Sequence, residues 1–142
     1  TVEKEKRLRV LMPTYSEEIL KLAERNVVPL VEGAPFTERA NELCGDRICV
    51  SPEIADGIIN TLHWKVDGCA ILKASAAYLA RSVGGKTPIE ALNLISAFRT
   101  SFDDEQSEFR SGPLSAVYRL PARYKCALLP WQACEDFLRQ HG

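Results

Sequence analysis

The segment RICVSPEIADGIINTLHWKVDGC, residues 47–69, contains the most strand-like sequence in the chain. Residues 47–53 and 58–66 are rich in β-branched and aromatic side chains, which favour an extended backbone. Between them lies Asp56-Gly57, a dipeptide typical of a tight turn between antiparallel strands. The segment therefore predicts a β-hairpin.

Pro52 lies inside the first of these strand-like runs. Proline has no N–H group to donate to a sheet, so it is usual only in edge strands and at strand ends. The sequence therefore predicts that this first strand ends early or lies at an edge of the sheet.

Helical signals follow the hairpin. Residues 70–83 have small and apolar side chains at helical spacing, and the two glycines at 84–85 end this pattern. The sequence T-P-I-E at 87–90 combines an N-cap, a proline at the first helical position and a capping-box glutamate. We therefore expect a second helix that begins there and runs to about residue 102.

Shorter elements are expected elsewhere. They are, in order, a charged lead-in at residues 1–13, a helix with Ser16 as its N-cap, a loop over most of residues 26–43, a polar loop at 103–113, a short helix at 114–118 and a helix that restarts at Pro130 and runs to about residue 140. The whole order predicts an α+β fold, with about three antiparallel strands in a small sheet and helices packed on one face. With 142 residues, the chain is expected to form a single domain over 1–142.

Composition argues against several classes of function. The chain has 18 basic and 19 acidic residues and a net charge of −1, so no positive excess favours nucleic acid or an anionic membrane surface. Its apolar runs are far shorter than the ~20 residues of a membrane span, and its charged N-terminus lacks the apolar stretch of a signal peptide. We therefore expect a cytoplasmic protein that binds neither nucleic acid nor membrane.

Cysteines are the chemically informative residues, and they stand at positions 44, 49, 69, 126 and 134. An odd number of thiols without a secretory signal favours metal ligands or reactive thiols over disulfides. Cys44 and Asp46 flank Gly45, and residues two apart in an extended segment face the same way, so the thiol and the carboxylate can point at one atom.

Cys69 and Cys126 are expected near helix starts, since Cys69 follows Gly68 and Cys126 follows Pro121. The partial positive charge of a helix N-terminus favours the thiolate form of cysteine. Three thiolates and one carboxylate suit zinc, and three thiolates also approach the ligand set of a [2Fe–2S] cluster.

The opposite interpretation stays open, because the spacing of these residues matches no short zinc motif. All five thiols can instead be small buried hydrophobic side chains. Cys49, in a predicted strand, and Cys134, in the last helix, are expected to be of that kind. His63 alternates with Leu62 and Trp64, so it is expected on the exposed face of its strand rather than as a ligand.

Several motifs together resemble a known family. They are N-E-L-C-G-D at 41–46, D-G-C-A-I at 67–71, A-S-A at 74–76, G-K-T at 85–87 and P-A-R-Y-K-C-A-L-L-P-W at 121–131. In this order they resemble the iron–sulfur cluster assembly scaffold family, which includes IscU, the N-terminal domain of NifU and SufU. The resemblance spans about residues 41–134 and implies the SufE/NifU-like (IscU-like) fold.

Within the family the chain looks most like the SufU branch, because Lys125 precedes the third cysteine where the IscU branch has histidine. The stretch at 87–121 also resembles an insertion typical of SufU-type proteins. This likeness implies zinc as cofactor and a zinc-dependent sulfurtransferase activity. Carried over by position, it implies the ligands Cys44, Asp46, Cys69 and Cys126, the sulfur acceptor Cys44, and Arg123 and Lys125 beside the site.

The same likeness implies the partners. A pyridoxal-phosphate cysteine desulfurase would donate persulfide sulfur, and downstream iron–sulfur assembly proteins or apo-proteins would receive it. Some positions depart from the family pattern: only Arg25-Asn26 matches a P-R-N-x-G segment, Glu42 replaces a proline, and A-S-A-S ends in Ala77. These departures fall near the region where the family meets its desulfurase, and they suggest a divergent or specialised paralogue.

Three functions remain after this reading of the sequence. The first is sulfur transfer through a Cys44 thiolate that zinc tunes. The second is a scaffold that assembles and hands over a [2Fe–2S] cluster on the same residues. The third is a structural zinc site without transfer activity. Lys125 in place of histidine favours the first function over the second.

Overall fold

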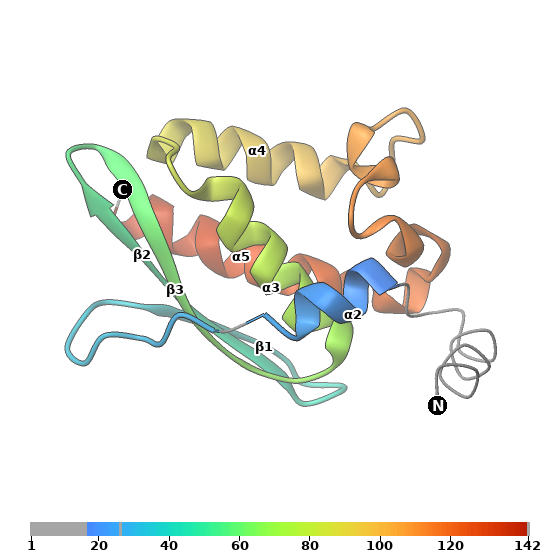
Figure 1. Ribbon diagram of the computed structural model, residues 1–142, viewed down its shortest axis with the longest axis horizontal. Coiled ribbons are helices and arrows are strands. Elements are labelled where there is room, and N and C mark those ends of the chain that lie inside the picture. Colours follow the sequence, from blue (N-terminus) through green and yellow to red (C-terminus); the bar gives the residue numbers. More distant parts are fainter. Residues whose placement is uncertain (1–16, 26, 142) are drawn as a thin grey trace.

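The structure is a computed structural model that describes residues 17–25 and 27–141. Along the chain the elements are α2 (Glu17–Ala23), β1 (Thr37–Asn41), β2 (Asp46–Ala55), β3 (Ile58–Asp67), α3 (Ala70–Val83), α4 (Pro88–Thr100), the 3₁₀ turns η1 (Glu108–Ser111), η2 (Ser115–Arg119) and η3 (Pro121–Arg123), and α5 (Tyr124–His141). The strands form one antiparallel sheet in the order β1-β2-β3. Helices α3 and α5 pack against it, and α4 lies beyond them (Figure 1). The predicted α+β class is confirmed.

The core lies between the sheet and the helices. Its buried side chains come from β2 and β3 on one side and from α3 and α5 on the other; among them are Ile48, Val50, Leu62, Trp64, Ile71, Leu72, Leu79, Trp131 and Phe137. Phe98 of α4 stacks on Trp131 with ring centroids 4.0 Å apart, which joins the outer helix to this core. Within the described part of the chain, no helix has both the length and the apolar character that a membrane span needs.

The predicted hairpin is present as β2 and β3, paired from Arg47 opposite Asp67 to Ala55 opposite Ile58. Its turn has positive φ angles at both central residues, 54° at Asp56 and 75° at Gly57. Two positive φ angles define the turn that matches the natural twist of antiparallel strands. The local sequence therefore sets the pairing next to the turn, and an irregularity between Glu53 and Ile54 shifts the register by one residue for the rest of the hairpin.

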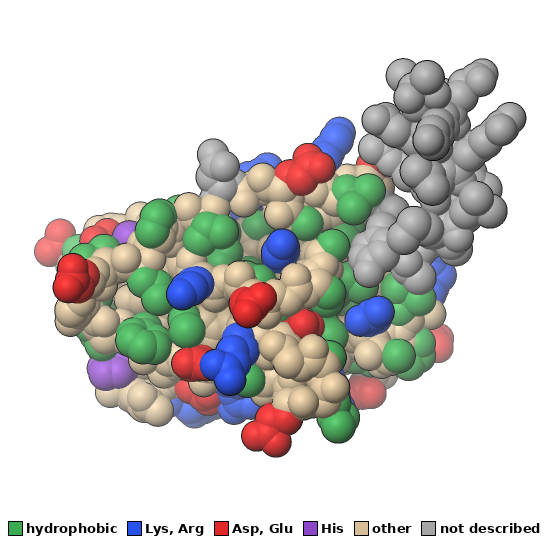
Figure 2. Space-filling view, turned by 90° about the horizontal axis from the view of Figure 1, so that it is seen from below, with side chains coloured by type: hydrophobic (Ala, Val, Ile, Leu, Met, Phe, Trp, Pro, Cys, Tyr) green, Lys and Arg blue, Asp and Glu red, His purple; other side chains and the backbone are tan. Residues whose placement is uncertain are grey.

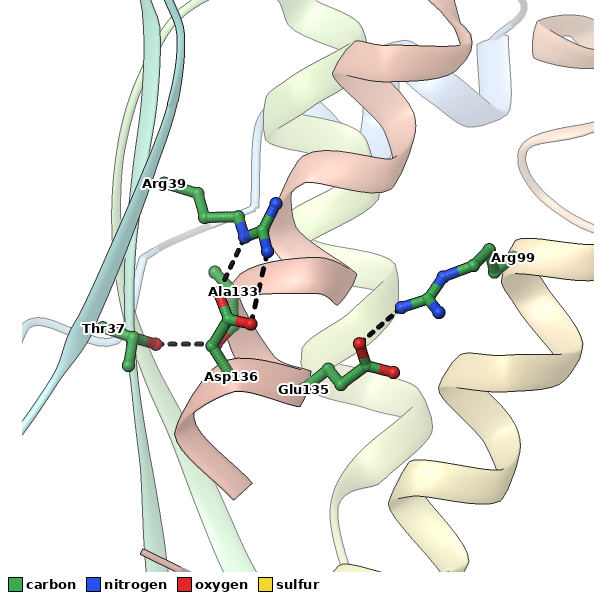
Figure 3. A network of polar contacts seen from close by, with 6 residues as sticks. All are labelled: Thr37, Arg39, Arg99, Ala133, Glu135 and Asp136. Carbon is green, nitrogen blue, oxygen red and sulfur yellow. Dashed lines mark hydrogen bonds and ion pairs between the residues drawn. The ribbon is translucent and has the colours of Figure 1, made fainter. Parts of the chain in front are cut away.

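β1 lies in a stretch that the sequence predicts to be mostly loop, and for this element that prediction is wrong. Its inward-facing side chains are polar, so it shows no apolar alternation. Thr37 Oγ1 donates to the carbonyl oxygen of Ala133 at 2.6 Å, and Arg39 Nε donates to the Asp136 carboxylate at 2.7 Å (Figure 3). These polar contacts with α5 hold the strand in place of apolar packing.

Pro52 lies in the central strand β2, which continues to Ala55, so the prediction of an early end or an edge strand is wrong. The Trp64 N–H donates outward to Val28 O, away from β2. Leu62 lies two residues from Trp64, so its backbone groups also point away from β2. Leu62 and its partner Pro52 are therefore a pair without mutual hydrogen bonds. The Pro52 nitrogen therefore faces the side of β1. Because β1 begins with Thr37 opposite Val50, it does not reach Pro52, and no backbone donor is needed there.

Helix α5 does not restart at Pro130 as predicted, because it runs unbroken from Tyr124 to His141. Proline inside a helix removes one backbone hydrogen bond and crowds the preceding turn. Here Ser75 of α3 supports that turn: its hydroxyl donates to Ala127 O at 2.5 Å and accepts from Trp131 Nε1 at 3.0 Å. The carbonyl that loses its helical N–H partner is that of Cys126, so the Ser75 contacts do not replace the missing bond. They fasten α5 to α3, and this packing holds the helix together across the proline.

The other helices agree closely with the sequence. Cys69 is the N-cap residue of α3, and Thr87 forms the expected capping box with Glu90 at the start of α4. A 3₁₀ turn, η2, stands where a short helix was expected. The predicted N-cap Ser16 and the lead-in at 1–13 lie outside the described residues.

Candidate metal centre

The four candidate ligands lie at three junctions between elements. Cys44 and Asp46 belong to the connection between β1 and β2, where Asn41 pairs with Asp46 across four intervening residues. Cys69 is the N-cap of α3, and Cys126 is the third residue of α5. The prediction that Cys69 and Cys126 stand near helix starts is confirmed.

Asn41 organises the loop that carries Cys44. Its side-chain oxygen accepts a hydrogen bond from Leu43 N at 3.1 Å, and its backbone oxygen accepts from Gly45 N at 2.8 Å and Cys44 N at 3.3 Å. Gly45 has φ of 76°, a conformation that favours glycine. The loop is therefore a defined turn, and Cys44 is exposed at its surface.

The structure brings three of the four side chains into one group and places Cys69 beside Asp46 at its edge. One ligand atom from each of Cys44, Asp46 and Cys126 lies within 4.8 Å of the other two. Cys69 Sγ lies 3.6 Å from Asp46 Oδ2. Tetrahedral zinc bonded at about 2.0–2.3 Å separates neighbouring ligand atoms by roughly 3.5–3.8 Å, and the 3.6 Å between Cys69 and Asp46 agrees with this spacing. Thiols and a carboxylate suit zinc, but Cys69 Sγ does not lie within 4.8 Å of every other donor and would have to move closer to complete a tetrahedron.

Burial differs among these residues. Asp46 and Cys126 expose 6% and 3% of their surface, while Cys44 is exposed. Burial, followed by the negative charges of Cys69, Asp46 and Cys44, raises the pKa of Cys126 from 9.0 to about 12. In the metal-free protein, Cys126 therefore holds its proton at neutral pH.

This proton gives a pH-dependent prediction for metal binding. A thiol must lose its proton to bind zinc, so zinc binding near pH 7 should release a proton from Cys126, and the apparent affinity should rise with pH. Titration calorimetry in buffers of different ionisation enthalpy measures this release. Cys126→Ser should release about one proton fewer than the parent chain; equal release from both would contradict the assignment.

In the metal-free protein, the raised pKa of Cys126 also makes the free energy of unfolding depend on pH. The folded chain holds the Cys126 proton more tightly than the unfolded chain does, because its pKa in the fold is about 12 against an ordinary 9.0. The stabilising contribution is complete below about pH 9 and is lost as pH rises towards 12.

Gly68 supports Asp46 directly, a role that the sequence reasoning did not assign. A Cβ at Gly68 would lie 2.7 Å from Asp46 Oδ1 and 2.6 Å from Leu72 Cδ2, distances that real structures do not allow. The missing side chain therefore makes room for the carboxylate. The signal in the sequence is a glycine directly before a cysteine at a helix start.

Asn41 was also missed as a functional residue, although the sequence offered a signal. Asparagine often hydrogen-bonds to the backbone two residues ahead, as it does here to Leu43, so an asparagine before C-G-D is a candidate turn former. Arg123 and Lys125, expected beside the site, line a hollow of about 340 Å³ together with Cys44 and Cys126.

The other thiols lie apart from this group. Cys134 is fully buried in α5, and burial raises its pKa to about 12. Cys49 lies on β2 opposite Glu38 and Lys65, and burial and the Glu38 charge raise its pKa. Cys134 is thus buried as predicted, whereas Cys49 is only partly buried.

His63 is partly buried rather than on an open strand face. Its Nδ1 lies 2.8 Å from Pro29 O, and since a carbonyl only accepts, Nδ1 donates. The segment around Pro29 therefore covers this side of β3.

Comparison with known proteins agrees with this geometry. Residues 14–101 match the family model of the NifU-like N-terminal domain. The chain is 32% identical over 100 residues to the zinc-dependent sulfurtransferase SufU of Bacillus subtilis, covering 67% of this chain and 68% of the relative. It is 28% identical over 134 residues to the iron–sulfur cluster assembly scaffold protein IscU of Thermotoga maritima, covering 89% of this chain and 93% of the relative.

The fold has a close counterpart among solved structures. The crystal structure of FiSufU from Fervidobacterium islandicum, described as an iron–sulfur cluster assembly scaffold protein for the SUF system, matches with a TM-score of 0.79 at 30% identity. The match covers 89% of this chain and 97% of that one. This chain belongs to the NifU-like N-terminal domain family, as the motifs in its sequence indicated, and its relatives include a sulfurtransferase named SufU and a scaffold protein named for iron–sulfur cluster assembly.

Proposed function

We propose that this chain binds zinc through Cys44, Asp46, Cys69 and Cys126 and accepts persulfide sulfur on Cys44 from a pyridoxal-phosphate cysteine desulfurase. The observation that carries the proposal is the arrangement of the four donors. Asp46 and Cys126 are buried, and Cys69 is fixed at a helix start, but Cys44 is exposed on a glycine-containing turn. The name of the Bacillus relative supports the same function.

Bound zinc would supply positive charge that keeps the thiols deprotonated. The chain itself positions the reacting thiol: the Asn41 hydrogen bonds hold the turn, and Cys44 faces solvent where a partner can reach it. Lys125 and Arg123 line the hollow at Cys44 and put positive charge beside the incoming anionic persulfide.

The transfer itself balances without an external oxidant. The Cys44 thiolate attacks the outer, sulfane sulfur of the donor persulfide. A new sulfur–sulfur bond forms on Cys44 as the bond in the donor breaks, and the donor cysteine leaves as a thiolate. Negative charge is therefore conserved, and Cys44 carries the persulfide onward.

Mass spectrometry tests this proposal. Zinc-loaded protein mixed with a cysteine desulfurase and L-cysteine, without reductant, should gain ~32 Da, one sulfur atom, on the peptide that contains Cys44. Cys44→Ser should abolish the label, whereas Cys49→Ser and Cys134→Ser, which change thiols outside the group, should keep it. An equal label on all five cysteines would show non-specific chemistry and contradict the proposal.

A second candidate function is assembly and transfer of a [2Fe–2S] cluster as cargo on the same residues. The IscU name of the Thermotoga relative favours it, as do the thiols of Cys44 and Cys126 grouped with Asp46 and the thiol of Cys69 beside that carboxylate. In that case no sulfur label appears on Cys44. Iron and sulfide instead produce visible absorbance, which is lost in the ligand variants.

A further inference from the structure

Leu43, directly before Cys44, is unusually exposed for a leucine. It is 89% exposed, the highest value among the large hydrophobic side chains that the structure describes. Its backbone N–H is hydrogen-bonded to Asn41 Oδ1 at 3.1 Å, so the turn holds the residue in this position. An apolar side chain held in water beside a reactive thiol is suited to contact a partner.

Two adjoining hollows meet at this leucine. One, of about 450 Å³, lies between β1 and α5 and has Leu128 and Leu129 in its lining. The other, of about 340 Å³, reaches Cys44 and Cys126. Leu43, Asn41 and Lys125 line both, so the two hollows adjoin at Leu43, one with the leucines of α5 in its lining and the other with the thiols; we refer to them together as the groove.

Charge in this groove is mainly positive. Arg39, Arg123 and Lys125 line it, against a single acidic lining residue, Glu42. Arg39 is paired with Asp136, and Lys125 lines both hollows, so its positive charge lies beside Leu43 and the thiols. The face opposite α4 shows acidic and basic side chains interspersed (Figure 2).

We propose that this groove binds an extended segment of the persulfide donor, in which an apolar side chain lies two residues from the persulfidated cysteine and an acidic side chain lies nearby. The inference rests on the proposed function and adds the chemistry by which the donor is recognised. In an extended chain, residues two apart point the same way. The apolar side chain would then contact Leu43 and Leu128 while the sulfur reaches Cys44, and the acidic group would face Lys125.

The experiment compares Leu43→Ser with Ile89→Ser in steady-state sulfur transfer from a cysteine desulfurase. Ile89 is a matched control, since it is also exposed, at 72%, but lies in the first turn of α4, at the other end of the molecule (Figure 1). We expect Leu43→Ser to raise the KM for the desulfurase about tenfold and to change kcat little, because an apolar docking contact is lost. Ile89→Ser should leave KM unchanged.

A second donor and a charge variant complete the test. Glutathione persulfide has no protein segment to dock, so its transfer to the Leu43→Ser chain should fall far less than transfer from the desulfurase. Lys125→Glu should raise the KM for the desulfurase and weaken its dependence on salt.

Three outcomes would overturn the inference. The first is an unchanged KM in Leu43→Ser. The second is an equal change in both serine variants. The third is a change of oligomeric state in Leu43→Ser without a change in KM, which would assign the groove to a second copy of this chain. Failure of the parent chain to take sulfur from any desulfurase would instead contradict the proposed function, and with it this inference.

Discussion

Removing zinc from the loaded protein should lower its melting temperature by about 10 °C. The metal would join the β1–β2 turn, the start of α3 and the start of α5, which are far apart in sequence. A ligand present at 100–1,000 times its dissociation constant stabilises the folded state by about 2.7–4.1 kcal/mol. In a domain of this size, each kcal/mol shifts the melting temperature by roughly 3–4 °C.

Scanning calorimetry before and after chelation, with metal content verified by elemental analysis, measures this shift. Asp46→Ala retains the three thiols but loses the carboxylate, so it should bind zinc more weakly and show a smaller shift on chelation. An unchanged melting curve after verified metal removal would show that the metal contributes nothing to the stability of the fold.

Gly68→Ala should weaken zinc binding by about 100-fold although it changes no ligand. The added methyl group would collide with the Asp46 carboxylate at 2.7 Å and with Leu72 at 2.6 Å. The carboxylate must then move away from the thiols, and loss of a residue that orients a ligand typically lowers metal affinity 10–100-fold. Competition with a chromophoric chelator at constant pH measures the change.

Gly84→Ala is the matched control, because Gly84 caps the opposite end of the same helix. A Cβ there would lie 3.5 Å from Ala80 O, an ordinary contact, and the φ angle of −59° suits any residue. Zinc affinity should therefore be unchanged in this variant. If both variants bind zinc equally well, the contact between Gly68 and the carboxylate has no role in the site.

The hairpin and the start of α4 could be predicted because their causes are local. Asp56-Gly57 forms the turn, and the Thr87 side chain accepts a hydrogen bond from the backbone of Glu90, three residues later. Neither feature depends on residues far away in the sequence. β1 could not be predicted in this way. Thr37 and Arg39 are hydrogen-bonded to residues nearly a hundred positions later in the chain, and the sequence around β1 carries no pattern that predicts those contacts.

The predictions made from Pro52 and Pro130 were both wrong. A proline disrupts a strand or helix only where its missing donor is needed. Whether the donor is needed depends on the neighbouring element, and β1, whose first residue Thr37 pairs with Val50, does not reach Pro52. At Pro130 one helical hydrogen bond is lost, and α5 continues because it packs on α3 and the sheet.

The candidate site was partly readable in the sequence. Glycines beside Cys44 and Cys69, and helix starts near Cys69 and Cys126, marked the thiols as unusual. That these thiols belong to one site followed only from the family resemblance, because residues so far apart in the sequence have no predictable distance in space. The contact of Gly68 with Asp46 depends on how α3 packs beside β2, so it required the fold itself.

The distribution of the four donors along the chain also bears on how the protein is made. More than half of the chain lies between Cys44 and Cys126. As the polypeptide leaves the ribosome, the hairpin and α3 emerge first and bring Cys44, Asp46 and Cys69. The fourth donor arrives only when α5 has been synthesised and has packed against the sheet. A truncated or half-folded chain therefore lacks the complete donor set, so under the proposed function metal loading would distinguish finished molecules from nascent ones.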